Sequence, residues 1–287
     1  MSLTVETVLK ETAGFFAKRG FEAARLEAEL LMAHLLATDR LRLYIEGDRP
    51  LTASEISAYK DLIRHRLSGQ PLAYITGEKS FLNWEFQITP AVLVPRPETE
   101  ILVEKAVARC RPLGTGRLLE LGTGSGVIAI ALAHYLPDFQ IDAVDLSPDA
   151  LQVAAANAEA HSLSGRINFY CGDLFAALAG LDRPVYSGIV TNPPYIPTAV
   201  IPTLAPEVRN EPRQALDGGP SGTLVIARII AEAITYLAPD GFLALEHGYD
   251  QFPVIEQLAK AAGFATVLSY QDYSGWPRVA VCQRTLS

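Results

Sequence analysis

A glycine-rich segment between two apolar stretches is the feature that most constrains the fold of this chain. Residues 120–126 have the sequence Glu-Leu-Gly-Thr-Gly-Ser-Gly, and the apolar stretch 127–133 follows directly. Glycines let a ligand approach the backbone closely, and the start of the following helix presents free N–H groups. A purely conformational turn is the alternative, but three alternate glycines between a strand and a helix favour ligand binding. The segment predicts a nucleotide-type site.

Strand-like and helix-like stretches alternate along the chain after Pro97. Helical stretches of crossover length separate most of the strand-like ones, which predicts a mostly parallel sheet covered by helices on both faces. Only a short turn around Gly275 separates the last two, so we expect these to pair antiparallel at one edge of the sheet. The predicted strands are Arg117–Leu121, Ile141–Val144, Ile167–Cys171, Gly188–Thr191, Phe242–Glu246, Ala265–Tyr270 and Arg278–Cys282.

The first part of the chain has a different pattern. Apolar residues recur at helical spacing from Thr4 to about Ser68, and glycine breaks among them predict a small domain of short helices over residues 1–76. Thr52 can cap one of these helices, with Glu55 in the reciprocal capping-box position. Alternating apolar residues then indicate an extended, hairpin-like connector over residues 77–97. We expect the α/β domain to occupy residues 98–287.

Composition disfavours several classes of protein. The chain has 24 Lys and Arg against 32 Asp and Glu, a net charge of −8, which is the wrong sign for gripping a phosphate backbone. Cys110, Cys171 and Cys282 lack paired spacing, so we expect neither a disulfide framework nor a metal site. We find no secretory or transit pattern and no apolar run of about 18 to 20 residues. A soluble, cytoplasmic protein without a membrane partner is expected.

The spacing of the glycines distinguishes between cofactors. A dinucleotide-binding turn needs a further glycine three positions after the second, where this chain has Val127, so NAD is disfavoured. A Gly-x-Gly-x-Gly turn after an acidic residue is similar instead to the turn of class I S-adenosylmethionine-dependent methyltransferases, which holds the amino-acid end of the cofactor. The residues expected to bind S-adenosylmethionine in this way are Gly122, Thr123, Gly124, Ser125 and Gly126.

Two further acidic residues follow the next two predicted strands. Asp145 is expected to accept hydrogen bonds from the ribose hydroxyls, because Ser147 and Pro148 already supply the start signal of the following helix. Asp173 is expected to face the amino group of the adenine. The backbone beside Asp173 could recognise the adenine edge instead, and a simple helix cap is an alternative role for this aspartate.

The most specific motif is Asn192-Pro193-Pro194-Tyr195, at the end of the fourth predicted strand. A planar nitrogen is a poor nucleophile because its lone pair is delocalised, so an enzyme that methylates it must fix the nitrogen. The side-chain carbonyl of Asn192 and the backbone carbonyl of Pro193 can each accept one hydrogen of an NH2 group. Tyr195 offers an aromatic face for a planar amide or base. The motif indicates an N-methyltransferase and leaves open adenine, cytosine or glutamine as its target.

Motifs along nearly the whole chain resemble those of one family, the protein-(glutamine-N5) methyltransferases of peptide chain release factors (PrmC/HemK). In the helical and connector regions these motifs are residues 28–34, 71–77 and 94–100. In the α/β domain they are Glu207-Val208, Asn210-Glu211-Pro212 and residues 215–219, then residues 271–275 with Arg278-Val279. The resemblance implies a class I methyltransferase, with a Rossmann-like, seven-stranded, mostly parallel sheet and an antiparallel edge pair, plus the small N-terminal helical domain.

The activity that this resemblance implies belongs to translation termination. Methyl is transferred from S-adenosylmethionine to the side-chain amide of the glutamine in the Gly-Gly-Gln loop of a release factor, leaving S-adenosylhomocysteine. The family pattern places the methionine part at residues 122–126, the ribose at Asp145, the adenine at Asp173 and Leu174, and the glutamine at residues 192–195. The helical domain is expected to dock the release factor. Family members can carry an aromatic residue where this chain has Leu174.

Two rival functions use the same motifs. An adenine-N6 DNA or RNA methyltransferase is compatible with Asn192 to Tyr195, but the acidic charge balance and the lack of a basic, aromatic-rich module disfavour it. We expect no stable binding of nucleic acid. A catalytically silent scaffold that binds the cofactor is the second rival, and the intact Asn192 argues against it.

Overall fold

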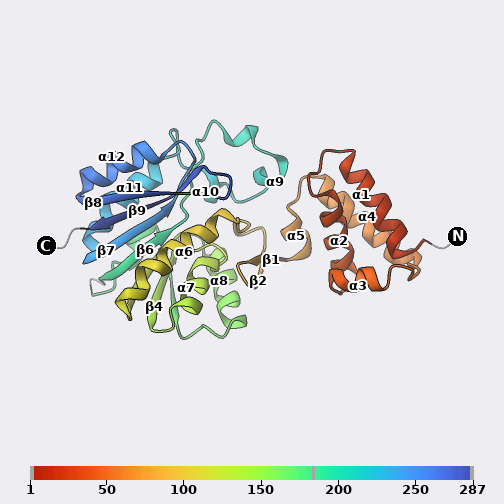
Figure 1. Cartoon of the computed structure of the whole chain (residues 1–287), viewed down its shortest axis with the longest axis horizontal. Helices are drawn as coiled ribbons and strands as arrows, with labels where there is room; N and C mark the ends of the chain where they lie inside the picture. Colours follow the sequence, from red (N-terminus) through yellow and green to blue (C-terminus); the bar gives the residue numbers. More distant parts are fainter. Residues whose placement is uncertain (1–2, 183–184, 285–287) are drawn as a thin grey trace. The chain divides into compact units, whose positions relative to one another are not determined.

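The computed structural model describes residues 3–182 and 185–284 of the 287-residue chain. It divides into two compact units (Figure 1). Of the described residues, 3–77 and Pro206–Asn210 form the helical unit, and 78–182, 185–205 and 211–284 form the α/β unit. The connector from Glu78 onward is thus part of the α/β unit. Within the described residues, no helix is both long and apolar enough to cross a membrane.

Short capped helices build the helical unit. Its elements are α1 (Val5–Ala17), α2 (Ala24–Leu35), α3 (Arg40–Ile45), α4 (Ala53–Leu67), α5 (Leu72–Thr76) and α9 (Pro206–Arg209). Thr52 and Glu55 form the predicted capping box at the start of α4. Phe16, Leu31 and Tyr59 are almost completely buried between the helices. The hydroxyl of Tyr59 donates to the carbonyl oxygen of Ala28 at 2.8 Å, so its polar end is satisfied inside this core.

The segment Pro206–Asn210 joins the helical unit through polar contacts. Arg66, at the end of α4, donates to the carboxylates of both Glu27 and Glu207. The side-chain amide of Asn210 donates to the carbonyl oxygen of Gly69 at 2.9 Å. Five residues that lie far along the chain are therefore held against the helices by directional bonds.

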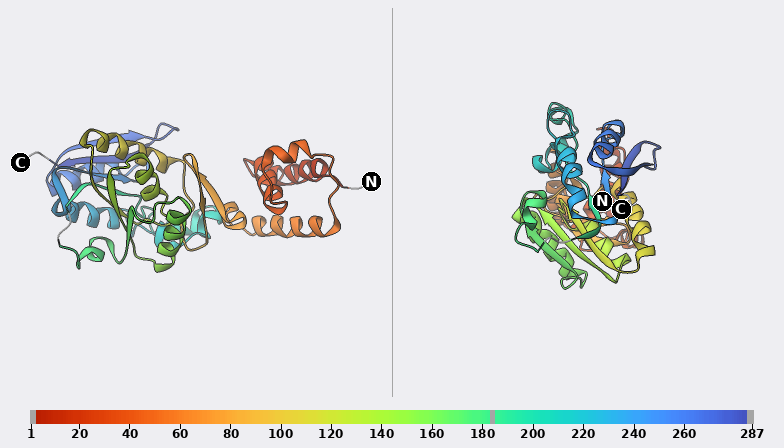
Figure 2. Two further views of the ribbon diagram at one scale, coloured as in Figure 1. Left: turned by 90° about the horizontal axis from the view of Figure 1, so that it is seen from below. Right: turned by 90° about the vertical axis from the view of Figure 1, so that its left-hand side faces the viewer.

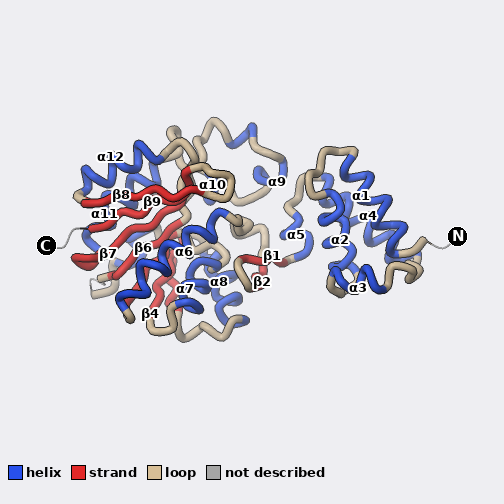
Figure 3. Tube along the Cα trace, viewed as in Figure 1, coloured by secondary structure: helices blue, strands red, loops and turns tan. Residues whose placement is uncertain are grey.

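The sheet of the α/β unit has the predicted architecture. Its order is β5-β4-β3-β6-β7-β9-β8, in which β9 pairs antiparallel with both neighbours and the other pairs are parallel. The strands of this sheet are red in Figure 3. β7 begins five residues earlier than predicted, because Leu237 pairs with Tyr186 before a register shift. The strands are β3 (Gly116–Leu121), β4 (Phe139–Asp145), β5 (Ile167–Cys171), β6 (Tyr186–Thr191), β7 (Leu237–Glu246), β8 (Phe264–Gln271) and β9 (Pro277–Arg284).

Helices cover both faces of this sheet. On one face lie α6 (Glu98–Cys110), α7 (Val127–Tyr135) and α8 (Pro148–Ala160), and on the other lie α11 (Leu224–Tyr236) and α12 (Phe252–Ala262) (Figures 1 and 2). Buried on both faces, the central strands are nearly continuous apolar runs, as parallel strands require. Short elements complete the unit: η1 (Arg111–Leu113), η2 (Leu174–Leu178), η3 (Ile201–Thr203) and α10 (Arg213–Leu216).

The predicted hairpin consists of β1 (Glu78–Phe81) and β2 (Trp84–Gln87), which pair antiparallel. Asn157 on α8 attaches it to the unit: its Oδ1 accepts from the backbone N–H of Gln87 at 2.8 Å, and its Nδ2 donates to the carbonyl oxygens of Gln87 and Ser125. Only 1% of Asn157 is exposed. One buried amide therefore links the hairpin to the glycine-rich turn.

Replacing Asn157 by alanine should lower the free energy of unfolding by about 1 to 3 kcal/mol, because buried backbone groups of Gln87 and Ser125 lose their partner. Chemical denaturation of the full chain, monitored by circular dichroism, measures this change. Gln152→Ala removes an exposed amide from the same helix and is the control. Equal stabilities of the two variants would show that Asn157 does not anchor the hairpin.

Candidate active site

One cavity of about 350 Å³ lies at the carboxyl ends of the parallel strands. The turns that follow β3, β4, β5 and β6 all contribute to its wall. The strand order changes direction between β3 and β6, and ligands of such sheets bind outside that switch point. The lining includes Thr123, Ser125, Asp145, Asp173, Leu174, Asn192 and Pro194, so most of the predicted site residues meet there.

The three glycines of the turn have different surroundings. All have positive φ angles, of 74° at Gly122, 56° at Gly124 and 83° at Gly126. A Cβ atom built on Gly124 would have no neighbour within 4 Å, and one built on Gly122 would have its nearest neighbour 3.9 Å away. Both glycines therefore leave open space beside the cavity. At Gly126 a Cβ would lie 3.1 Å from that of Ala154. Gly126 is absent from the cavity lining and permits close packing of α7 against α8.

Two acidic side chains fix the shape of the glycine-rich turn. Glu120 is fully buried at the end of β3, where its Oε2 accepts from the hydroxyl of Thr123 and the backbone N–H of Ala129. Burial raises the pKa of Glu120 to about 8. Asp145 accepts from the backbone N–H of Gly124 at 2.8 Å and from that of Ser147 at 2.9 Å. Both oxygens of Asp145 are thereby held at the edge of the cavity.

Asp173 and Leu174 follow β5, as predicted, and both line the cavity. The side chain of Asp173 makes no capping hydrogen bond to η2. The alternative role of Asp173 as a helix cap is therefore wrong. Arg228 on α11 donates instead to Asp173 at 2.8 Å. Leu174 has a φ of 50°, in the left-handed region that a branched side chain rarely adopts. Such strain is often found at binding sites.

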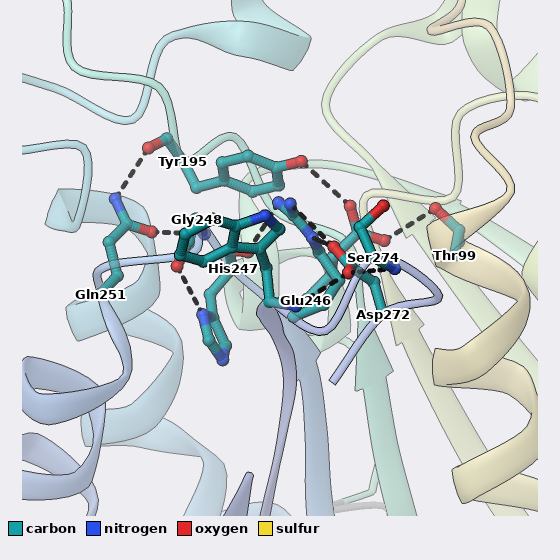
Figure 4. Close-up of polar contacts among 10 residues, drawn as sticks. Thr99, Tyr195, Glu246, His247, Gly248, Gln251, Asp272 and Ser274 are labelled. Atoms are coloured by element: carbon teal, nitrogen blue, oxygen red, sulfur yellow. Dashed lines mark hydrogen bonds and ion pairs between the residues drawn. The ribbon is translucent and has the colours of Figure 1, made fainter. Parts of the chain in front are cut away.

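The Asn192 motif follows β6, where Asn192 and Pro194 line the cavity. The Nδ2 of Asn192 donates to the hydroxyl oxygen of Thr99 at 3.2 Å, which leaves Oδ1 to accept from a ligand. Pro193 is buried, and neither it nor Tyr195 is part of the lining. The hydroxyl of Tyr195 donates to Glu246 at 3.1 Å (Figure 4).

Several residues of this site were not predicted from the sequence. Glu246 lies at the end of β7 and is fully buried beside Tyr195. Burial raises the pKa of its carboxyl, whereas the hydrogen bonds from Thr99 and Tyr195 lower that pKa. Glu211 accepts from the backbone N–H of Val94 and pairs with Arg96, which holds the insert after β6 beside a wall of the cavity. Thr99, Arg96 and Glu211 all lie in the motifs that resemble those of the family. The resemblance was therefore the sequence signal that pointed to these three residues.

Comparison with known proteins agrees with this architecture. Residues 97–268 match the family model of the methyltransferase small domain, and residues 7–77 match that of the PrmC N-terminal domain. A methyltransferase from Pyrococcus furiosus has the same fold, with a TM-score of 0.55 at 18% identity over 79% of this chain and 99% of that one. The fold, the glycine-rich turn and the Asn192 motif together define a class I S-adenosylmethionine-dependent methyltransferase.

Two relatives identify the family within that class. The release factor glutamine methyltransferase of Moorella thermoacetica is 40% identical and covers 98% of this chain and 99% of its own length. The release factor glutamine methyltransferase of Geobacter sulfurreducens is 42% identical, and the match covers 96% of this chain and 95% of that protein. The chain belongs to the release factor glutamine methyltransferase family (PrmC/HemK).

Replacing Asp145 by alanine should weaken the binding of S-adenosylmethionine by about 10- to 100-fold, the range of hydrogen bonds to a charged group. The same change releases Gly124 and so loosens the turn. Isothermal titration calorimetry measures the Kd. Asp149→Ala removes an exposed carboxylate close by in sequence, outside the cavity, and is the control. Equal Kd values for wild type and Asp145→Ala would refute the assignment of Asp145.

Proposed function

We propose that this chain transfers a methyl group from S-adenosylmethionine to the side-chain amide nitrogen of the glutamine in the Gly-Gly-Gln motif of peptide chain release factors. The observation that carries the proposal is the orientation of Asn192. Its amide nitrogen is bound to Thr99, so its carbonyl oxygen is available to an NH2 group in the cavity. Membership of the release factor glutamine methyltransferase family supports glutamine as the target rather than a base.

The cavity lining fits S-adenosylmethionine. The open space beside Gly122 and Gly124 suits the methionine part, and the lining residues Asp145 and Asp173 with Leu174 support contacts to the ribose and to the adenine, respectively. When bound, the cofactor supplies an electrophilic methyl carbon and leaves as S-adenosylhomocysteine. The transfer itself requires no metal ion, because a sulfonium already activates the methyl group.

The chain's own residues act on the glutamine amide. The carbonyl oxygen of Asn192 and that of Pro193 each accept one hydrogen of the NH2 group, which fixes the nitrogen and favours a pyramidal geometry. The nitrogen then forms its new bond to the methyl carbon as the bond from that carbon to sulfur breaks. The positive nitrogen loses one proton to solvent, so the reaction needs no dedicated base. Tyr195 remains a neutral phenol, because burial raises its pKa.

The helical unit supplies a surface for the release factor in this proposal. One glutamine side chain offers little binding area, and a stable complex needs a larger contact. Leu41 and Ile45 on α3 are 69% and 71% exposed, and Tyr44 between them is 55% exposed. Exposed apolar side chains of this size on a small domain are typical of protein contacts.

Replacing Asn192 by alanine should lower kcat by about 100- to 1,000-fold with an unchanged Kd for S-adenosylmethionine, because one preorganised acceptor is lost. Mass spectrometry of an undermodified release factor measures the added methyl group, with a Gln→Ala loop variant and unmethylated DNA as alternative substrates. Asn83→Ala, an exposed change on the hairpin, is the matched control. Labelling of DNA alone, or near-normal turnover by Asn192→Ala, would refute the proposal.

Replacing Leu41 and Ile45 together by serine should raise KM for an intact release factor by about tenfold or more, because central apolar contacts are lost. Methylation of a short Gly-Gly-Gln peptide should not change. Val254→Ser, which alters an exposed apolar residue on α12, is the control. Equal effects on the intact factor and on the peptide would contradict docking on α3.

A further inference from the structure

We propose that Thr99 and Glu246 are positioning residues that set which way the amide of Asn192 faces. Glu246 does not line the cavity, so it acts on the reaction through other side chains. The inference rests on the proposed transfer to a glutamine amide and deepens it. It assigns a task to a buried carboxylate that the mechanism above leaves unused.

A continuous chain of hydrogen bonds joins the three residues. The Nδ2 of Asn192 donates to Oγ1 of Thr99 at 3.2 Å. That hydroxyl in turn donates to Oε2 of Glu246 at 2.7 Å (Figure 4). Thr99 lies in the first turn of α6 and Glu246 at the end of β7, 147 residues apart in sequence. They are 3% and 1% exposed, so water competes little for these bonds.

The direction of the chain follows from counting hydrogens. A threonine hydroxyl has a single hydrogen, and Thr99 donates it to Oε2 of Glu246. The oxygen of Thr99 is then available to Asn192 only as an acceptor, so Asn192 must direct its NH2 group toward Thr99. Its carbonyl oxygen consequently faces the ligand. The reversed amide would present hydrogens to the hydrogens of the substrate NH2 group and could not hold it.

The same carboxylate also holds the last residue of the motif. Its Oε1 accepts from the hydroxyl of Tyr195 at 3.1 Å, while the backbone carbonyl of Tyr195 accepts from Nε2 of Gln251 at 2.8 Å (Figure 4). The two ends of Tyr195 are therefore fixed by different elements. Glu246 thus anchors both the first and the last residue of the Asn192-to-Tyr195 motif.

The test compares Thr99→Val, which has nearly the same shape but no hydroxyl, with Thr99→Ser, which keeps the hydroxyl. We expect Thr99→Val to lower kcat for release factor methylation by about 10- to 100-fold, with KM and the Kd for S-adenosylmethionine within about twofold of wild type. Thr99→Ser should restore kcat to within about threefold. Thr12→Val, a buried threonine of the helical unit, controls for the general effect of this substitution.

A double-mutant cycle separates positioning from simple support of the fold. Because Thr99 and Glu246 act through Asn192, Thr99→Val and Glu246→Met should each change kcat by less than about twofold when Asn192 is already alanine. Methionine is close to glutamate in shape but cannot take the place of a carboxylate acceptor. If Thr99→Val fails to fold, as judged by its melting curve, the Glu246→Met arm of the cycle gives the same answer.

Two results would overturn the inference. The first is a wild-type kcat in a folded Thr99→Val or Glu246→Met variant. The second is a loss of kcat that is as large in the Asn192→Ala background as in the wild-type background. Absence of methylation by the wild-type protein itself would instead refute the proposed function, so the two failures are distinguishable.

Discussion

Parallel pairing of β3 with both β4 and β6 is the constraint on which the site depends. Parallel strands end at the same edge of a sheet, so the turns after these strands must meet there. The glycine-rich turn, Asp145 and Asn192 are far apart in sequence, and this pairing brings them to one cavity. The antiparallel pair β8 and β9 lies beyond β7 and leaves the arrangement of the central strands unchanged.

Buried or half-buried acidic side chains hold the backbone and side chains around that cavity. Glu120 and Asp145 accept from the glycine-rich turn, Glu211 accepts from Val94, and Glu246 accepts from Thr99 and Tyr195. Each carboxylate satisfies donors from elements that would otherwise move independently. Part of the chain's acidic excess therefore stabilises the site and is not a surface property that reports on partners.

Local patterns predicted most of the fold, and pairings between distant residues supplied what they missed. The strand–helix alternation and the short turn at Gly275 are local, so they predicted the sheet and its antiparallel edge. The glycine spacing predicted a binding turn but did not distinguish Gly126, whose neighbour Ala154 lies on another helix. The bonds of Thr99 to Glu246 and of Asp173 to Arg228 depend on the register of the packed elements, which no single motif encodes.

The two hydrogen bonds to Asp145 have a kinetic consequence. Because the backbone N–H groups of Gly124 and Ser147 already hold both carboxylate oxygens, this side chain has little torsional freedom left to lose when a ligand binds. A ribose would meet an acceptor that is in place before encounter. At Asp145 itself, no rearrangement of the side chain has to precede binding.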